Sequence, residues 1–255
     1  MRTALFHNVY GITGGEERTV DLEDELLTMA GHHGARFDVL NDRVFGCFDL
    51  DTLQSGVRAS WNPALYRSVR DFLTESRPDV AHVHDWFPLL SPSVYSAFHD
   101  AGVPVVQTLH DFRLGCAAGR MLRDGKNCDL CIGGDRRPAV HNSCYRGSRL
   151  QSRVWKGAME RGWSTGLFQS LVDAYIAPSE VVATQHRRMG IPADLLTVLP
   201  MHASTLSPPR SWAENRRGQW HPTETAQCTL AVSRRKKASR HCSRRGPVWT
   251  RHSTS

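Results

Sequence analysis

The chain has 255 residues, of which 40 % are hydrophobic, and a formal net charge of +7. It contains no run of about eighteen apolar residues, which argues against a membrane-spanning helix. The N-terminal residues hold one Arg and a short apolar stretch that His7 interrupts, a pattern typical of a first strand and not of a secretory signal peptide. We therefore expect a cytoplasmic protein.

Apolar spacing predicts alternating strands and helices along the first 200 residues. Turn-forming Gly and Pro residues separate them, and acids stand where helices should begin. In chain order we expect strand 3–9, helix 19–29, strand 36–40, a helix opened by Asn62 and ended by Arg77, strand 79–84, helix 93–101, strand 104–110, helix 149–171, strand 173–177, helix 179–189 and strand 195–199.

This alternation is the signature of an α/β fold with a Rossmann-like parallel sheet and flanking helices. Ligands bind such sheets at the carboxyl ends of the strands. Three pairs of residues stand at those ends, namely Gly14 with Gly15, His84 with Asp85, and His110 with Asp111. We therefore expect a ligand site built from these pairs.

The positive charge is confined to the C-terminal part of the chain. Residues 210–255 hold eleven Lys or Arg and two Glu, a net charge of +9, which leaves 21 basic and 23 acidic residues for residues 1–209. The tail also carries Trp and Cys without helical or strand spacing, although disordered arms are usually poor in both. We expect one domain over 1–205 and an unstructured basic tail over 206–255. An out-of-frame segment is favoured over a genuine disordered extension or a nucleic-acid arm.

Several motifs together make the chain similar to a known family. Their joint order and spacing resemble the N-terminal domain of the retaining, two-domain (GT-B) glycosyltransferases of family 4 type. The motifs are Gly14-Gly15-Glu16, the segment 77–84 (RPDVAHVH), the segment 87–92 (FPLLSP), the segment 102–111 (GVPVVQTLHD), the cysteine cluster, the segment 144–148 (CYRGS) and the segment 174–179 (AYIAPS).

The resemblance implies that a nucleotide-diphosphate sugar donates its sugar to an acceptor hydroxyl, with the anomeric configuration kept. The N-terminal domain of that family mainly holds the acceptor, and a second domain holds the nucleotide. No cofactor beyond the donor substrate is implied. The motifs fade near Pro200, so we expect a truncated or frameshifted member that lacks transfer activity by itself.

Gly14 and Gly15 occupy a strand-to-helix turn, where a bare backbone and a helix N-terminus suit an anion or a sugar hydroxyl. Spacing alone favours a simple tight turn. The resemblance favours a substrate-binding loop that includes Glu16, because this loop faces the interdomain cleft in the family.

His110 ends a strand, and its ring is suited to bond the transferred sugar or the acceptor while Asp111 orients the ring. We expect these two residues to be catalytic, with a histidine satisfied by backbone as the alternative. His82 and His84 point to one face of a strand. His84 with Asp85, at the carboxyl end, is the better substrate-binding candidate, whereas His82 should pack beneath a helix.

An insertion over 112–150 is rich in Cys, Gly and Arg. Arg113 and Arg146 are candidates for contact with a phosphate-bearing acceptor such as a lipid-linked sugar diphosphate. A solvated basic loop is the plainer interpretation for most of its arginines. Contact with the inner face of the membrane is an alternative localisation.

Four cysteines of this insertion follow the spacing C-x11-C-x2-C-x12-C, namely Cys116, Cys128, Cys131 and Cys144. A Cys-x2-Cys pair with two flanking thiols can close a tetrahedral structural zinc site. The alternatives are four reduced thiols or a redox pair.

Two functions of different classes remain open at this point. The first is the acceptor-side domain of a glycosyltransferase, with no specific nucleic-acid partner. The second is a stand-alone sugar- or phosphate-binding module whose basic tail binds anionic surfaces, which would weaken steeply with salt.

Overall fold

The computed structural model describes residues 1–10, 15–41, 58–200 and 249–253. Its main sheet has the strand order β8-β7-β4-β3-β1-β2-β9. The first six of these strands run parallel, and β9 pairs antiparallel with β2. The bounds are β1 Arg2–Tyr10, β2 His33–Asn41, β3 Val80–Asp85, β4 Val105–Thr108, β7 Ala174–Ala177, β8 Leu196–Val198 and β9 Trp249–Ser253. The Rossmann-like parallel sheet expected from the sequence is confirmed.

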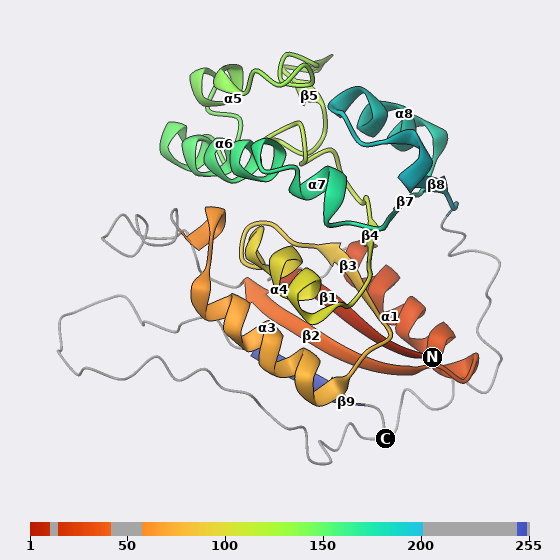
Figure 1. Ribbon diagram of the computed structural model, residues 1–255. Helices are drawn as coiled ribbons and strands as arrows, with labels where there is room; N and C mark the ends of the chain where they lie inside the picture. The colour runs from red at the N-terminus through yellow and green to blue at the C-terminus, as the bar shows by residue number, and fades with distance from the viewer. Residues whose placement is uncertain (11–14, 42–57, 201–248, 254–255) are drawn as a thin grey trace, which may run out of the picture.

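Helices connect the parallel strands, and a small hairpin stands apart from the main sheet. In Figure 1, α3 and α4 cross in front of β1 and β2, while β5, α5 and α6 occupy the upper part of the view. The bounds are α1 Gly15–Met29, α3 Pro63–Ser76, α4 Ser93–Ala101, α5 Arg137–His141, α6 Arg149–Ser164, α7 Leu167–Ser170 and α8 Glu180–Met189, with hairpin strands β5 Leu122–Arg123 and β6 Lys126–Asn127.

Local signals set the helix ends. The side chain of Asn62 accepts a hydrogen bond from the backbone N–H of Leu65 and so caps α3, which satisfies one of the free donors of a helix N-terminus. Ser148 and Ser179 cap α6 and α8 in the same way. Gly190 closes α8 with a φ of 108°, a conformation that glycine adopts without strain.

The two faces of the sheet differ in chemistry because side chains alternate along a strand. On one face Phe6 packs against Phe72 of α3 and Phe98 of α4, with ring centroids 5.5 and 4.7 Å apart. On the other face β1 presents His7 toward Glu17 of α1. The aromatic face holds the core, and the histidine face lies beneath α1.

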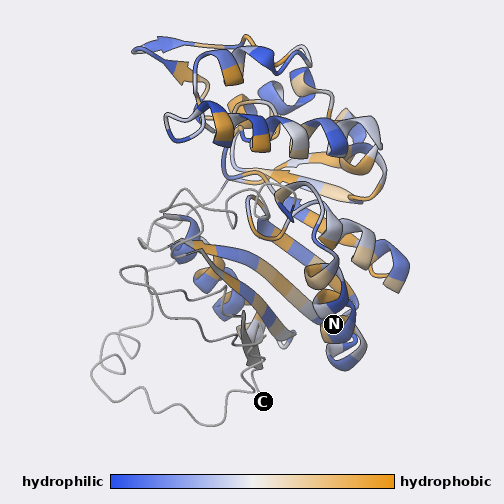
Figure 2. Ribbon diagram, turned by 90° about the vertical axis from the view of Figure 1, so that its left-hand side faces the viewer, coloured by the Kyte–Doolittle hydropathy of each residue, from blue (hydrophilic) through white to orange (hydrophobic). Residues whose placement is uncertain are grey.

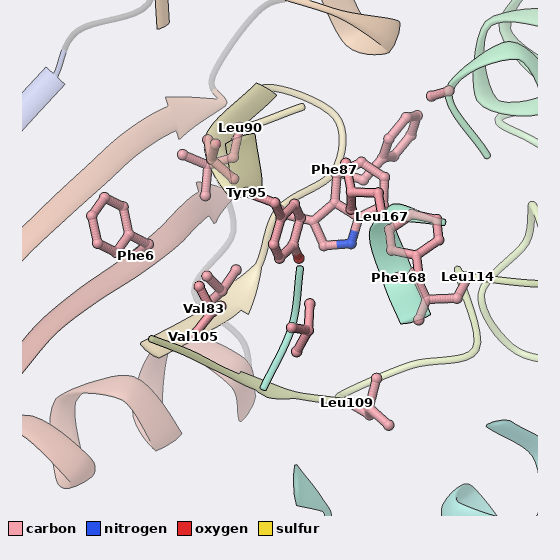
Figure 3. Close-up of a cluster of buried hydrophobic side chains, with 14 of the residues drawn as sticks. Phe6, Val83, Phe87, Leu90, Tyr95, Val105, Leu109, Leu114, Leu167 and Phe168 are labelled. Carbon is pink, nitrogen blue, oxygen red and sulfur yellow. The ribbon is translucent and has the colours of Figure 1, made fainter. Parts of the chain in front are cut away.

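The core continues toward the insertion. Figure 3 shows Tyr95 and Phe168 among the clustered apolar side chains. Tyr95 is buried and donates its hydroxyl to Oε1 of Gln107 at 2.8 Å, so the phenol is satisfied despite its burial. Trp155 and Met159 of α6 are fully buried. Figure 2 shows hydrophobic and hydrophilic segments alternating along the helices that flank this core.

Two segments differ from the sequence-based expectation. The single helix expected over 149–171 is broken between α6 and α7, because Gly166 takes a left-handed φ of 69°. In place of the unstructured backbone expected throughout 206–255, residues 249–253 form β9 on the open edge of β2, where unpaired backbone groups are available for pairing. Across the described residues, no helix combines the length and apolarity needed to cross a membrane.

Candidate functional site

A cavity lies at the carboxyl ends of β3 and β4, beside the N-terminal end of α1. It encloses about 320 Å³ of empty space, part of it open to solvent. This is the position at which open parallel sheets bind ligands. The residues around it are Glu16, His84, Asp85, Trp86, Phe87, Gln107, Thr108, Leu109, His110, Asp111, Arg113 and Leu114.

Most of the residues singled out in the sequence meet at this cavity, although they come from three separate segments. Those that line it are Glu16, His84, Asp85, His110, Asp111 and Arg113. Gly15 begins α1 and leaves open space where a Cβ would stand, whereas Gly14 lies outside the described residues. Arg146 does not line the cavity.

A chain of buried and half-buried histidines runs beneath α1 to the cavity. Nδ1 of His84 lies 3.0 Å from Nε2 of His110. On its other side, Nε2 of His84 lies 3.4 Å from a carboxylate oxygen of Glu23. His82 also contacts Glu23 through Nδ1, and its Nε2 lies 2.8 Å from Oγ1 of Thr108. One carboxylate of α1 is therefore shared by two histidines of β3.

Burial favours the neutral form of the His110, His84 and His7 rings. It lowers the pKa of His110 to about 4, against a smaller opposing effect of Asp111. Burial, reinforced by the neighbouring rings of His82 and His110, lowers the pKa of His84 well below its usual value. Burial also lowers the pKa of His7 to about 4. At neutral pH the site therefore offers uncharged imidazoles, each with one donor and one acceptor nitrogen.

Glu16 has the opposite perturbation. Burial and then repulsion from Asp85 and Asp111 raise the pKa of Glu16 to about 8, although Arg113 opposes the effect. Desolvation and like charges both disfavour an ionised carboxyl group. Glu16 is thus mostly protonated at pH 7 and can donate as well as accept a hydrogen bond.

Asp111 is bonded to Arg113. Its Oδ1 accepts from the backbone N–H of Arg113 at 2.8 Å, and its Oδ2 accepts from Nε at 2.9 Å. The sequence reasoning assigned Asp111 to orient His110, whereas the hydrogen-bond partner of the His110 ring is His84. Gly119 lies against this pair: a Cβ there would stand 2.8 Å from Oδ2 of Asp111.

Arg146 and Arg113 both lie close to the aromatic ring of Tyr145. The guanidinium of Arg146 lies 5.6 Å from the ring centroid of Tyr145, and that of Arg113 lies 5.7 Å from the same centroid. Both distances are within the range of cation–π contacts. Arg146 thus shares the ring of Tyr145 with Arg113, which lines the cavity.

Sequence reasoning missed Glu23, Thr108 and His7. Glu23 lies mid-helix among other acids, where an exposed position is the usual outcome. Thr108 and His7 lie near the carboxyl ends of their strands, so the rule that selected His84 and His110 could also have selected them. His7 is fully buried, and neither ring nitrogen has a hydrogen-bond partner among the described residues.

Two groups of side chains could hold a metal ion. The first group is Glu23, His82 and His84. Each offers one possible ligand atom, and these three atoms lie within 4.8 Å of one another, the only such group in the described part of the chain. Cys116, Cys128, Cys131 and Cys144 do not meet that spacing, but all four line one cavity above the main sheet. Each is half-buried and free of disulfide bonds.

A family described as "Glycosyl transferase 4-like domain" matches residues 21–202. No curated protein matches the chain.

The fold is similar to parts of several solved structures. One is the UDP-GlcNAc 2-epimerase from Methanocaldococcus jannaschii, with 12 % identity and a TM-score of 0.42 over 78 % of this chain and 45 % of that one. A second is Anabaena HepE in complex with UDP, with 16 % identity and a TM-score of 0.39 over 78 % and 43 %. A third is the UDP-N-acetylglucosamine 2-epimerase from Rickettsia bellii, with 11 % identity and a TM-score of 0.39 over 78 % and 44 %. The chain spans less than half the length of each.

Proposed function

The chain belongs to the glycosyl transferase 4-like family, and we propose that it carries the acceptor-side half of an active site that transfers a sugar from a nucleotide-diphosphate sugar to an acceptor hydroxyl, with retention. The observation that carries the proposal is the convergence of three segments on one cavity. Glu16 from α1, His84 and Asp85 from β3, and the residues from His110 to Arg113 after β4 all line it.

The histidine chain assigns a role to each ring nitrogen. Nε2 of His84 makes no hydrogen bond in the described part of the structure, but its nearest charged neighbour is a carboxylate oxygen of Glu23 at 3.4 Å. Because a carboxylate offers only acceptor atoms, we assign the proton of His84 to this nitrogen. Nδ1 of His84 is then an acceptor, and Nε2 of His110 must donate to it. This leaves Nδ1 of His110 with a lone pair, and no side-chain hydrogen bond to it forms within the described residues. That atom accepts the hydrogen bond of a sugar hydroxyl.

The charged side chains fit the charge that develops during transfer. Departure of a nucleoside diphosphate builds negative charge on the leaving group and positive charge at the sugar carbon, and fixed donors and dipoles provide most of the stabilisation. Arg113, fixed by Asp111, faces an anionic group. Asp85 and the protonated Glu16 contact sugar hydroxyls. Arg146 supports a phosphate-bearing acceptor such as a lipid-linked sugar diphosphate.

The resemblance implies that a second domain holds the donor nucleotide, and the family match covers residues 21–202. We therefore expect the 255-residue chain on its own to bind acceptor and to transfer little or no sugar. Contact with a lipid-linked acceptor would bring the protein to a membrane surface.

The experiment titrates the full chain with a water-soluble, short-chain polyprenyl diphosphate sugar and follows the imidazole NMR signals of His84 and His110. Arg113→Ala should weaken binding by about tenfold or more, the loss of about 1.4 kcal/mol expected for a charge-assisted contact. Arg137→Ala is the matched control. Arg137 bonds Asp135 two residues earlier through its backbone N–H and Nε, in the same way as Arg113, but it is exposed and far along the insertion.

Two results would contradict separate parts of the proposal. Unchanged imidazole signals at saturating ligand, or equal losses in both arginine variants, would exclude the cavity as the acceptor site. Transfer of radiolabelled sugar from a nucleotide sugar by the 255-residue chain alone would leave the site in place and overturn the expected inactivity.

A further inference from the structure

The insertion contains an arm that buries almost no apolar side chains. The arm comprises residues 120–135 and includes the β5–β6 hairpin. Its residues are exposed or half-buried except for Ile132. The two hairpin strands have two residues each, and a lone hairpin of this kind is marginally stable at best in water. Such a segment needs a tether other than a hydrophobic core.

Four thiols surround one cavity at the base of this arm. The cysteine cavity is lined by Gly115, Cys116, Ala117, Ala118, Leu122, Arg123, Cys128, Cys131, Ile132, Ala139 and Cys144. Cys116 precedes the arm, Cys128 and Cys131 lie within it, and Cys144 follows α5. The chain therefore brings together thiols from both ends of a 29-residue stretch, although none is bonded to another.

Backbone turns aim the sulfurs inward. The N–H of Cys116 bonds the carbonyl of Phe112, and the carbonyl of Cys116 accepts from the N–H of Gly119. The N–H of Cys128 bonds the carbonyl of Met121 and closes the hairpin. The turn between the hairpin strands has positive φ at Asp124 and Gly125, as a tight two-residue hairpin connection requires.

Burial raises the pKa of the thiols of both Cys131 and Cys144. The carbonyl of Ala139 accepts from the N–H of Cys144, and the backbone N–H of Ala139 lowers the pKa of Cys131 against the larger effect of burial. The cation of Arg123 opposes the rise in the pKa of Cys144. Besides burial, the other three thiols contribute to the rise, which brings the pKa of Cys131 to about 11.

We propose that the four cysteines of this cavity bind one structural zinc ion, which fastens the arm to α5 and to the end of the segment that follows β4. Zinc prefers a tetrahedral set of thiolates, and four of them close the coordination sphere. The ion therefore has no open position for a substrate, and its role is to hold the insertion. Zn–S bonds of about 2.3 Å require the sulfurs to move closer than they stand, and their half-buried positions on turns allow that movement.

The site depends on neither the acceptor cavity nor the proposed transfer reaction. Its chemistry also differs from that of Glu23, His82 and His84, where a carboxylate contacts a ring nitrogen of His82 directly and both rings have a second partner. Those side chains already contact one another beneath α1, whereas the four thiols share a cavity.

The test uses the full chain, produced with zinc in the medium and purified under reducing conditions. Elemental analysis should give about one zinc per chain. The double variant Cys128→Ser/Cys131→Ser should lose it. The matched control Cys228→Ser/Cys242→Ser removes two thiols from the C-terminal segment and should retain it. Replacement of zinc by Co²⁺ in the unaltered chain should give the absorption of tetrahedral thiolate-bound cobalt, a readout that does not depend on folding of a variant.

Three outcomes would overturn the proposal. The first is a reduced, zinc-exposed chain that carries no metal. The second is metal binding at the histidines instead of the cysteines. A cobalt spectrum without thiolate bands would show it, and so would zinc that is lost from Glu23→Gln/His82→Gln but kept by the double cysteine variant. The third is a metal-free chain with a disulfide between Cys128 and Cys131, which would make the pair a redox couple.

Discussion

Nδ1 of His84 and Nε2 of His110 lie 3.0 Å apart in the buried layer beneath α1. Two imidazole nitrogens at that distance bond only if one carries a proton and the other does not. Because burial lowers the pKa of both rings, both are neutral at pH 7, and the tautomer of one ring fixes that of the other. This pair couples the end of β3 to the residue that lines the cavity after β4.

Glu23 should select the tautomers of this pair. In the unaltered chain we expect the proton of His84 on Nε2 and that of His110 also on Nε2. Glu23→Gln replaces a pure acceptor with a group that can also donate, so His84 should populate both tautomers and His110 should follow. Long-range ¹H–¹⁵N correlations of the imidazole rings report the tautomer directly.

Glu25→Gln is the control for that measurement, because Glu25 is an exposed glutamate of the same helix. It should leave both tautomers unchanged. A proton on Nδ1 of His84 in the unaltered chain would refute the assignment of the Nδ1 lone pair of His110 to the ligand.

The raised pKa of Glu16 makes stability fall with rising pH. Its carboxyl group has an ordinary pKa of 4.5 when exposed and about 8 in the folded chain. Between these values the unfolded chain has lost the proton while the folded chain keeps it, so each step toward higher pH favours unfolding. The melting temperature of Glu16→Gln should therefore decline less between pH 5 and 8 than that of the unaltered chain.

Glu25→Gln serves again as the comparison, because it removes an exposed carboxyl group from the same helix. Its melting temperature should follow the pH dependence of the unaltered chain. If Glu16→Gln shows that same slope, then Glu16 ionises normally, and it cannot act as a hydrogen-bond donor to a sugar at neutral pH.

The sequence was sufficient to predict the parallel strands and to select the carboxyl ends of those strands as the candidate site. The alternation of strands and helices predicted β1, β3, β4 and β7, and the strand-end rule selected His84 and His110. These features depend on local periodicity and on a general property of parallel sheets. They need no knowledge of which side chains meet.

Pairing between distant segments could not be predicted. Nothing local in α1 indicates that Glu23 turns inward to β3, because its neighbours are charged and its spacing also suits an exposed face. The bond from Asp111 to Arg113, in preference to His110, depends on a loop conformation that Gly119 permits. The edge pairing of β9 with β2 joins residues more than 200 positions apart, beyond the reach of any periodicity.

Gly119 should be required beside the Asp111–Arg113 pair. Its φ is 73°, and a Cβ would lie 2.8 Å from Oδ2 of Asp111 and 3.2 Å from Nη2 of Arg113. Gly119→Ala should therefore destabilise the fold by about 1–2 kcal/mol through backbone strain and displace Arg113. Urea unfolding measures the first effect, and the diphosphate-sugar titration measures the second.

Gly133→Ala is the matched change in the same insertion. A Cβ there meets nothing within 4 Å, and the backbone φ is not in the left-handed range. Its effect should stay within about 0.5 kcal/mol, with ligand binding unaltered. Equal stabilities of the two variants would show that the loop can re-form around a Cβ at residue 119, and that the pair does not depend on this glycine.

Substitution by Ala at two glycines of α6 should change the stability of the fold in opposite directions. At Gly162 a Cβ would stand 2.3 Å from a ring carbon of Phe168, which is fully buried and packed against Trp86 and Trp163. The ring has no room to withdraw, so Gly162→Ala should cost about 1–3 kcal/mol by overpacking.

At Gly157 the nearest atom is Oγ of Ser60 at 3.5 Å, an ordinary contact. Gly157→Ala should therefore stabilise the helix by about 0.5–1 kcal/mol, because alanine loses less backbone entropy. The urea midpoints of the two variants should bracket that of the unaltered chain. A stabilised Gly162→Ala would mean that Phe168 is not fixed against α6, and that the close approach of α6 and α7 does not hold in solution.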